Sequence, residues 1–145
     1  MRFEEYLAEG SVRKVSPDKN LAKSLLKISA KRIKNIYAEK ITDDNSFQII
    51  ENCYEAMREI IDALMSVKGY KTYSHEASVE FLKAFFYPQL DTSTINKIDR
   101  YRILRNDIKY RGLLTTKIDA EICLKDTKEI MPKLLELAKK EKVFD

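Results

Sequence analysis

Residues 46–69 read SFQIIENCYEAMREIIDALMSVKG, and this stretch decides the fold. Its apolar residues recur at alternating spacings of three and four, in two adjacent rows. One row holds Phe47, Ile50, Tyr54, Met57, Ile61 and Leu64, and the other holds Ile49, Cys53, Ala56, Ile60 and Ala63. Two adjacent rows give a helix a wide buried face. The pattern therefore predicts a central helix over residues 46–67 that stops at Gly69.

Two helices are predicted before this central helix, a short one over residues 3–9 and a long one over residues 17–38. Ser16 is the expected cap of the long helix, and Pro17 suits its first position. Apolar spacing predicts the inner side of this long helix. That side is expected to hold Leu21, Ala22, Leu25, Ile28, Ser29, Ile33 and Ile36.

Three more helices are predicted after Gly69, over residues 75–87, 92–110 and 116–140. Ser74 is a good cap for the first, and the second is expected to stop near Gly112. Thr116 and Asp119 have the spacing of a capping box at the start of the third, in which Pro132 should introduce a kink.

The composition agrees with a helical protein. Three glycines and three prolines in 145 residues indicate long elements with few turns, which argues against a β-sandwich. This length suits one domain, residues 1–145, with a hydrophobic core of its own. We therefore expect an all-α fold without a sheet. The expected architecture is an antiparallel bundle of four long helices and one shorter helix.

The remaining totals narrow the class of protein. Cys53 and Cys123 lie within apolar helical patterns, which favours small core residues over a disulfide. The polar stretch MRFEEYLAEG at residues 1–10 does not resemble a signal peptide. No apolar run approaches the roughly 20 residues that span a bilayer. We expect a cytoplasmic protein that has no membrane contact, metal site or cofactor.

Two predicted helices carry stripes of like charge. The basic stripe consists of Lys19, Lys23, Lys27 and Lys31, followed by Arg32 and Lys34; the acidic stripe consists of Glu51, Glu55, Glu59 and Asp62. Three interpretations remain open. In the first, both stripes are solvent-exposed faces of their helices. In the second, the stripes form ion pairs with each other, and in the third, the basic stripe binds phosphate.

The stretch INKIDRYRILRNDIKYRGLL, residues 95–114, is the best candidate for a functional site. On a helix, Arg102, Arg105 and Lys109 lie close together on one outer side, with Asn106 beside them. The fixed fork of an arginine matches a phosphate, so the cluster indicates an anion site. The alternative is that Arg105 forms an ion pair with an acid of a neighbouring helix.

The run RNDIKY, residues 105–110, resembles the signature of HEPN domains, in which a His follows an Arg after four to six residues. Two other stretches also resemble prokaryotic HEPN proteins. They are EEYLAEGSVRKVSPDKNLAKSLLKISAKR, residues 4–32, and ENCYEAMREIIDALMSVKGYKTYSHEASVEFL, residues 51–82. These three segments lie between residues 4 and 110 of the 145-residue chain.

This resemblance implies an RNA- or nucleotide-binding protein, as a component of a toxin–antitoxin or defence system. Many HEPN domains are metal-independent ribonucleases that work as dimers, with the two motifs meeting in a composite cleft. Others bind RNA or nucleotides without cleavage, or pair with a minimal nucleotidyltransferase. The positions that match the family's catalytic residues are then Arg105, Asn106 and Tyr110. The basic residues of the same stretch are the expected phosphate-binding residues, namely Arg102, Arg105, Lys109 and Arg111. A homodimer through the helix at 92–110 is expected.

One departure from the family weakens the case for catalysis. Tyr110 stands where the His belongs, and a phenol with a pKa near 10 is about three units too weak as a base at neutral pH. It can still hydrogen-bond a phosphate or stack on a base. We therefore expect binding without efficient cleavage. Two alternatives stay open, an active endoribonuclease using Arg105 with Tyr110 or His75, and a non-catalytic helical interaction module.

Three residues of the 70–75 region have competing interpretations. His75, the single histidine, either replaces the missing base or packs and caps the start of a helix. Tyr70 and Tyr73 either stack on a base or cover a loop. The residue types favour the packing role in each case.

Overall fold

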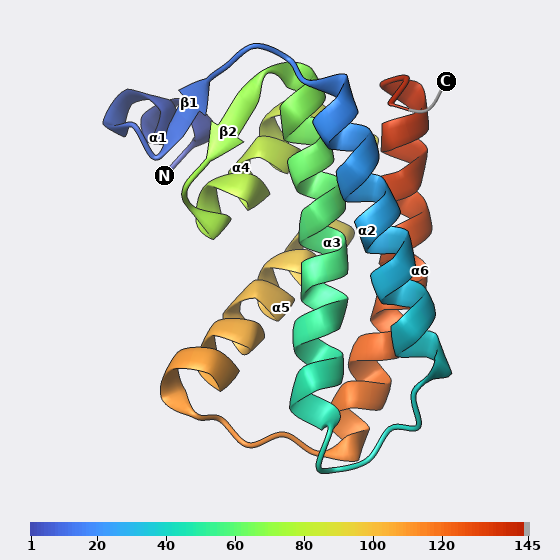
Figure 1. Ribbon diagram of the computed structural model, residues 1–145. Coiled ribbons are helices and arrows are strands. Elements are labelled where there is room, and N and C mark those ends of the chain that lie inside the picture. The colour runs from blue at the N-terminus through green and yellow to red at the C-terminus, as the bar shows by residue number, and fades with distance from the viewer. Residues whose placement is uncertain (144–145) are drawn as a thin grey trace.

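The computed structural model describes residues 1–143, in which six helices and two short strands occur (Figure 1). In chain order these are α1 (Phe3–Glu9), β1 (Val12–Lys14), α2 (Lys19–Ala38), α3 (Ser46–Lys68), β2 (Tyr70–Thr72), α4 (His75–Phe86), α5 (Thr92–Arg111) and α6 (Lys117–Lys140). None of the helices in this part of the chain is both long and apolar enough to cross a membrane. The predicted all-α class is confirmed at this level, because helices make up most of the described residues.

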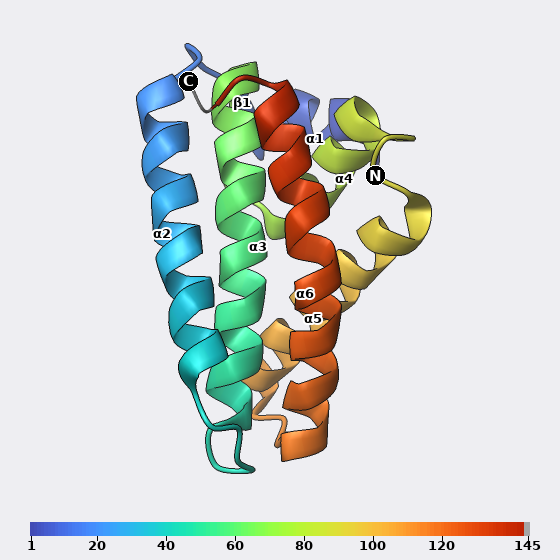
Figure 2. The same cartoon turned by 90° about the vertical axis from the view of Figure 1, so that its right-hand side faces the viewer.

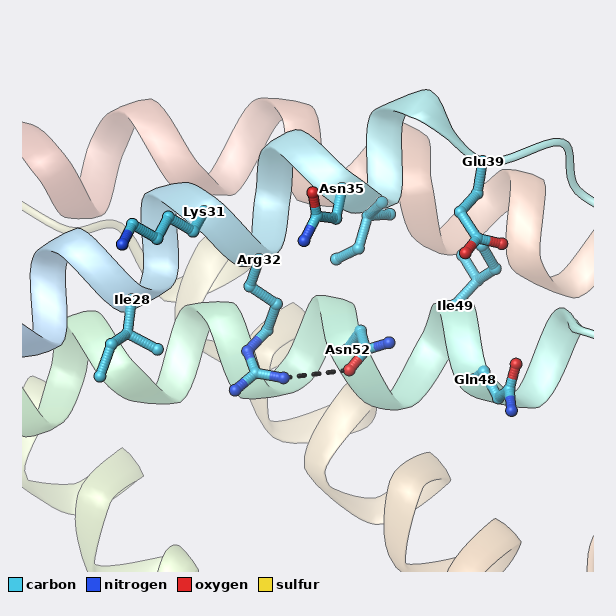
Figure 3. Close-up of a pocket in the computed structure, with 9 residues that line it drawn as sticks. Ile28, Lys31, Arg32, Asn35, Glu39, Gln48, Ile49 and Asn52 are labelled. Atoms are coloured by element: carbon cyan, nitrogen blue, oxygen red, sulfur yellow. Dashed lines mark hydrogen bonds between the residues drawn. The ribbon is translucent and has the colours of Figure 1, made fainter.

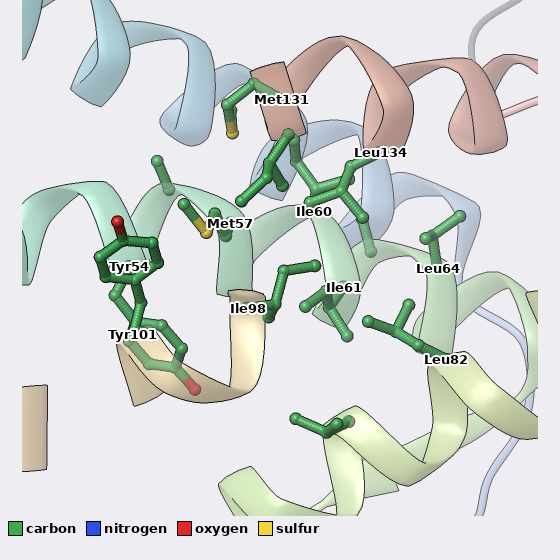
Figure 4. Packing of buried hydrophobic residues seen from close by; sticks show 14 of the residues in the cluster. Tyr54, Met57, Ile60, Ile61, Leu64, Leu82, Ile98, Tyr101, Met131 and Leu134 are labelled. Atoms are coloured by element: carbon green, nitrogen blue, oxygen red, sulfur yellow. The ribbon is translucent and has the colours of Figure 1, made fainter. Parts of the chain in front are cut away.

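The prediction that residues 46–67 form the central helix is confirmed. α2 and α6 run beside α3, as Figures 1 and 2 both show, and α4 and α5 pack on its remaining side. Both apolar rows of α3 are buried except for Phe47, which is 40% exposed. Figure 4 shows residues of this core, with Met57, Ile60 and Ile61 of α3 between side chains of α5 and α6.

The arrangement differs from an antiparallel bundle. α6 runs parallel to α3, since Ser46 and Thr115 are hydrogen-bonded at one end (2.6 Å) and Lys68 and Glu141 form an ion pair at the other (3.2 Å). α4 and α5 lie between them in the chain and bring it back to the starting end. α5 is inclined to the other long helices (Figure 1), so its C-terminal end lies away from the upper part of the bundle.

The expectation of no sheet is wrong, because β1 and β2 form a two-stranded antiparallel ribbon. Each strand has three residues, and Val12 pairs with Thr72, so no local spacing in the sequence predicts the pairing. Gly69 allows the ribbon to join α3. It has φ +83°, and a Cβ there would lie 2.8 Å from the carbonyl oxygen of Val15. The backbone N–H of Val15 donates to the Gly69 carbonyl (2.9 Å).

Several predicted helix ends are confirmed. Ser74 accepts a hydrogen bond from the backbone N–H of Ala77, and Thr116 forms the capping box with Asp119. α6 also continues through Pro132. Cys53 and Cys123 are buried free thiols.

The predicted start of α2 is wrong. Its cap is Asp18, whose carboxylate accepts from the N–H of Leu21 (2.9 Å), and not Ser16 with Pro17 in the first turn. A tertiary contact selects this position. Ser66 of α3 donates its hydroxyl proton to the Asp18 carbonyl and accepts, through its own carbonyl, from the Asp18 N–H. The last turn of α3 therefore fixes where α2 begins.

The predicted inner side of α2 is correct only in part. Ala22, Ser29 and Ile36 are buried, whereas Leu21 and Ile28 are 49% and 46% exposed. The hydroxyl of Ser29 donates to the carbonyl of Ala56 on α3 (2.7 Å). Ser29 thus marks a point of direct contact between α2 and α3, and Leu21 and Ile28 lie at the exposed margin of the inner side.

Candidate functional site

The helix that contains residues 105–110 places Arg105 on its inner face. α5 begins after Asp91, whose carboxylate accepts from the N–H of Thr94 (3.3 Å), and ends at Gly112 in a left-handed conformation. Arg105 is only 9% exposed and lies on the same side as the buried Tyr101 and Ile108. The expectation that Arg105 lies on an outer side of this helix with Arg102 and Lys109 is therefore wrong.

Arg105 is instead held by carboxylate and amide oxygens. Its Nη2 atom lies 3.5 Å from Oε1 of Glu55 on α3, and its Nη1 donates to Oδ1 of Asn106 (3.2 Å). Glu55 also accepts from Nη1 of Arg58 (3.3 Å). These contacts match the alternative in which Arg105 pairs with an acid of a neighbouring helix. They attach the middle of α5 to α3.

His75, at the start of α4, lies beside this cluster. Its Nδ1 atom is hydrogen-bonded to the hydroxyl of Tyr54 (3.2 Å), and the two rings are stacked. Burial, with the nearby guanidinium of Arg58, lowers the pKa of His75 to about 4. Burial also raises the pKa of Tyr54 to about 12. Both groups are therefore neutral at pH 7, and His75 is a weak base there.

The outer side of α5 forms a hollow of about 370 Å³, which we call the α5 hollow. It is lined by Arg102, Ile103, Asn106, Asp107, Tyr110 and Arg111 of α5 and by Glu76 of α4. Residues 102, 106 and 110 are spaced four apart and therefore lie on one helix face. The predicted site residues therefore fall into two groups. Arg102, Asn106, Tyr110 and Arg111 share the α5 hollow, whereas Arg105 and Lys109 do not line it.

The two arginines that line the α5 hollow differ in how far their side chains are exposed to solvent. Arg102 donates to Oδ1 of Asp99 (2.7 Å) and lies 3.8 Å from Glu76, and its side chain is 13% exposed. Arg111 lies 3.7 Å from Asp107, but its side chain is 81% exposed. Tyr110 is 70% exposed, and Nζ of Lys109 lies 5.6 Å from its ring centroid. The helix end therefore offers an exposed guanidinium next to an open aromatic ring.

Sequence reasoning missed an exposed apolar surface where α5, the following turn and α6 meet. Its members are Ile103, Leu113, Leu114, Ile118 and Ile122, each between 44% and 92% exposed. Beside it, a groove of about 430 Å³ runs between α5 and α6, with Asp107, Asp119 and Asp126 among its lining residues. Leu113 and Leu114, which follow Gly112 beyond the end of the helical pattern, are the feature of the sequence that could have predicted this surface.

The two charge stripes are in contact between α2 and α3. Arg32 of α2 donates from Nε and Nη2 to the two carboxylate oxygens of Glu59 on α3 (3.0 and 2.9 Å). Its Nη1 donates to Asn52 (3.1 Å), at the edge of a polar hollow of about 330 Å³ between these helices (Figure 3). Pairing between the stripes is thus confirmed for Arg32 and Glu59, while Lys27 and Lys31 are exposed.

No group of three or more His, Cys, Asp or Glu side chains is placed to hold a metal ion in residues 1–143. Comparison of the chain with protein-family models, curated proteins and solved structures finds no match.

Proposed function

We propose that this chain is a HEPN-like protein that binds RNA or nucleotide phosphate at the α5 hollow, with weak or absent cleavage. The observation that carries the proposal is the convergence of Arg102, Asn106, Tyr110 and Arg111 on one hollow. The resemblance of residues 105–110 to the HEPN signature supports it, and implies a toxin–antitoxin or defence system as the setting.

The α5 hollow combines the groups that a nucleotide needs. Arg111 is exposed enough to form a bidentate contact with a phosphate. The exposed ring of Tyr110 offers a face for a base, and the amide of Asn106 offers polar partners. Glu76 and Asp107 balance the formal charge of Arg102 and Arg111, so we expect binding of moderate strength that weakens with salt.

Binding is a better proposal than cleavage because no suitable base accompanies the hollow. Tyr110 is a phenol, and the pKa of His75 is lowered to about 4 by burial. Arg105, which the family motif assigns to the phosphate, is already paired with Glu55. The active-ribonuclease alternative therefore requires a rearrangement that separates this pair.

The test is RNA binding by Arg111→Ala and Tyr110→Ala, measured by fluorescence anisotropy at low salt. Arg111→Ala removes a charge-assisted contact worth roughly 1.5–3 kcal/mol, and Tyr110→Ala removes a stacking contact worth about 1–3 kcal/mol. Each should therefore weaken binding by about five- to a hundredfold. Lys125→Ala, an exposed lysine on α6, serves as the control. Equal affinity of all three variants and the parent would reject the site. RNA incubated with the parent without metal should stay intact.

The interaction-module alternative is favoured by the exposed apolar surface of α5 and α6, because such surfaces are typical of protein contacts. A two-fold contact between two copies of α5 at Ile103 would cover this exposed side chain with its own symmetry mate, as an isologous interface requires. We propose a homodimer there; a minimal nucleotidyltransferase is the other candidate partner. Light scattering of Ile103→Lys should then show a smaller species than the parent.

A further inference from the structure

The ribbon of β1 and β2 carries an unusual group of side chains on its exposed side. Arg13 and Lys71 are directly opposite each other in the antiparallel register. Tyr73, which directly follows β2 and lies two residues after Lys71, is 61% exposed. Cζ of Arg13 and Nζ of Lys71 lie 5.6 and 5.5 Å from the Tyr73 ring centroid, so both cations contact one aromatic ring.

In the part of the chain that the structure describes, no carboxylate forms an ion pair with Arg13 or Lys71. Residues 10–17 and 68–73 contain no Asp or Glu, and the carboxylate of Glu9, which flanks the ribbon, accepts a hydrogen bond from the hydroxyl of Ser11 (2.5 Å). Like charges directly opposite each other on two strands are destabilising. An anion bound between them would remove this cost.

Tyr73 has no role in the core that would explain an aromatic residue there. The other side of the ribbon makes the core contacts. Val12 is 1% exposed, and Tyr70 packs against Phe3, with ring centroids 5.3 Å apart. The loop-cover interpretation therefore applies to Tyr70 and leaves Tyr73 unexplained.

We propose that this ribbon binds single-stranded nucleic acid, with a base stacked on Tyr73 and the adjacent phosphates held by Arg13 and Lys71. An exposed ring flanked by cations matches both parts of a nucleotide, since bases stack on aromatic rings and phosphates pair with Arg and Lys. An acidic peptide would use the cations without needing the ring. The proposal concerns a site separate from the α5 hollow and does not depend on it.

The ribbon and the α5 hollow are nevertheless close in the chain. Glu76, which lines the hollow, lies three residues after Tyr73, a span of at most about 11 Å. The charge of Glu76 is partly compensated by Arg102 and by a hydrogen bond from the hydroxyl of Tyr6 (3.1 Å). A single strand of a few nucleotides that contacts both places would therefore cross the start of α4.

The experiment uses the absence of tryptophan from the chain. Tyr73→Trp places a single fluorescent reporter in the site, and a stacked base should quench it when an unstructured oligoadenylate RNA is added. Tyr87→Trp is the matched control, because Tyr87 is 59% exposed and the cation–ring contacts of the structure do not include it. Saturable quenching of the indole fluorescence in Tyr73→Trp, and none in Tyr87→Trp, is the expected result.

Affinity measurements complete the test. Tyr73→Leu keeps an apolar side chain but removes the ring, and should weaken oligonucleotide binding by about five- to a hundredfold relative to Tyr87→Leu. Arg13→Ser and Lys71→Ser should each reduce the slope of log affinity against log salt by about one. Thermal unfolding checks that each variant is folded.

Three results would overturn the proposal. The first is that RNA does not quench the fluorescence of Tyr73→Trp, and the second is that Tyr73→Leu binds RNA with the affinity of the parent. The third is that both the parent and Tyr73→Leu bind anionic vesicles more tightly than they bind RNA. The outcome is separable from that of the α5 hollow. Loss of affinity in Tyr73→Leu but not in Arg111→Ala would reject the hollow and keep the ribbon, and the reverse would do the opposite.

Discussion

The middle and the C-terminal end of α5 carry the same kinds of residue in different environments. Arg105 is 9% exposed and paired with Glu55 of α3, whereas the side chain of Arg111, six positions later, is 81% exposed. The difference follows from the inclination of α5, which brings its middle against α3 and leaves its end uncovered (Figure 1). Burial beside an acid makes an arginine a structural contact, and exposure beside an aromatic ring makes it available to a ligand.

The largest expected effect that tests this comparison is on stability. Arg105→Ala leaves Glu55 with one fewer partner at a buried contact, and should lower the free energy of unfolding by about 2–4 kcal/mol. Arg111→Ala, at the exposed end, should change it by less than about 0.5 kcal/mol. Chemical denaturation measures both. Similar values for the two variants would contradict the assignment of different roles.

The second effect concerns pH. Because the folded-state pKa of His75 is about 4 and the unfolded value is near 6.5, the unfolded chain binds more protons between these values. The contribution of His75 to the free energy of unfolding should therefore fall as the pH drops from about 6.5 to 4, by up to roughly 3 kcal/mol. Nuclear magnetic resonance titration of the ring gives the pKa directly.

Asp62 acts in the opposite direction over much of the same range. Burial raises its pKa to about 6, so protonation of Asp62 favours the folded state as the pH falls toward 4. The difference in unfolding free energy between the parent and His75→Gln at each pH isolates His75. A ring that titrates near 6.5 would show that the site is open to water, and would favour His75 as a base.

The third effect is at the end of α5. Gly112 has φ +66°, with no atom within 4 Å of the position that a Cβ would occupy. Gly112→Ala should therefore cost about 1 kcal/mol through backbone strain alone, and Gly112→Asn less, because Asn tolerates the left-handed conformation. Thermal unfolding compares the two. If RNA binding also falls in Gly112→Ala, the exposed end depends on where the helix stops.

The smallest expected effect is that of Tyr110→His, which introduces the histidine that the proposed resemblance to HEPN domains would have at this position. Tyr110 is 70% exposed, so stability should change by less than about 0.5 kcal/mol. RNA cleavage without metal should remain near background, because Arg105 stays paired with Glu55. Strong cleavage by this variant would instead show that Arg105 can leave that pair.

The elements that the sequence predicts well are those with local signals. The two apolar rows of α3 are a pattern within that helix itself, and Ser74 and Thr116 immediately precede the helices that they cap. Each signal is therefore close in the chain to the structure that it predicts. The errors involve distant contacts. The start of α2 depends on Ser66, and the ribbon depends on strands far apart in the chain.

The same distinction applies to the candidate site. Helical spacing places Arg102, Asn106 and Tyr110 on one face, as the α5 hollow requires. Arg105 lies four residues after Tyr101 and three before Ile108, so helical spacing alone is enough to place it on the buried side. Its partner, Glu55, belongs to another helix and cannot be found from the spacing within residues 95–114. The sequence leaves the role of Tyr73 open, because one of its cation contacts comes from a strand about sixty residues earlier.

The ribbon also has a consequence for the order of folding. Pairing of Val12 with Thr72 closes a chain segment that contains all of α2 and α3. Contacts of such long sequence separation bear a large loop-closure cost unless the intervening helices have already docked. We expect the helical hairpin of α2 and α3 to form first and the strands to pair after the rate-limiting step. Substitutions on the ribbon should then speed unfolding and leave the folding rate nearly unchanged.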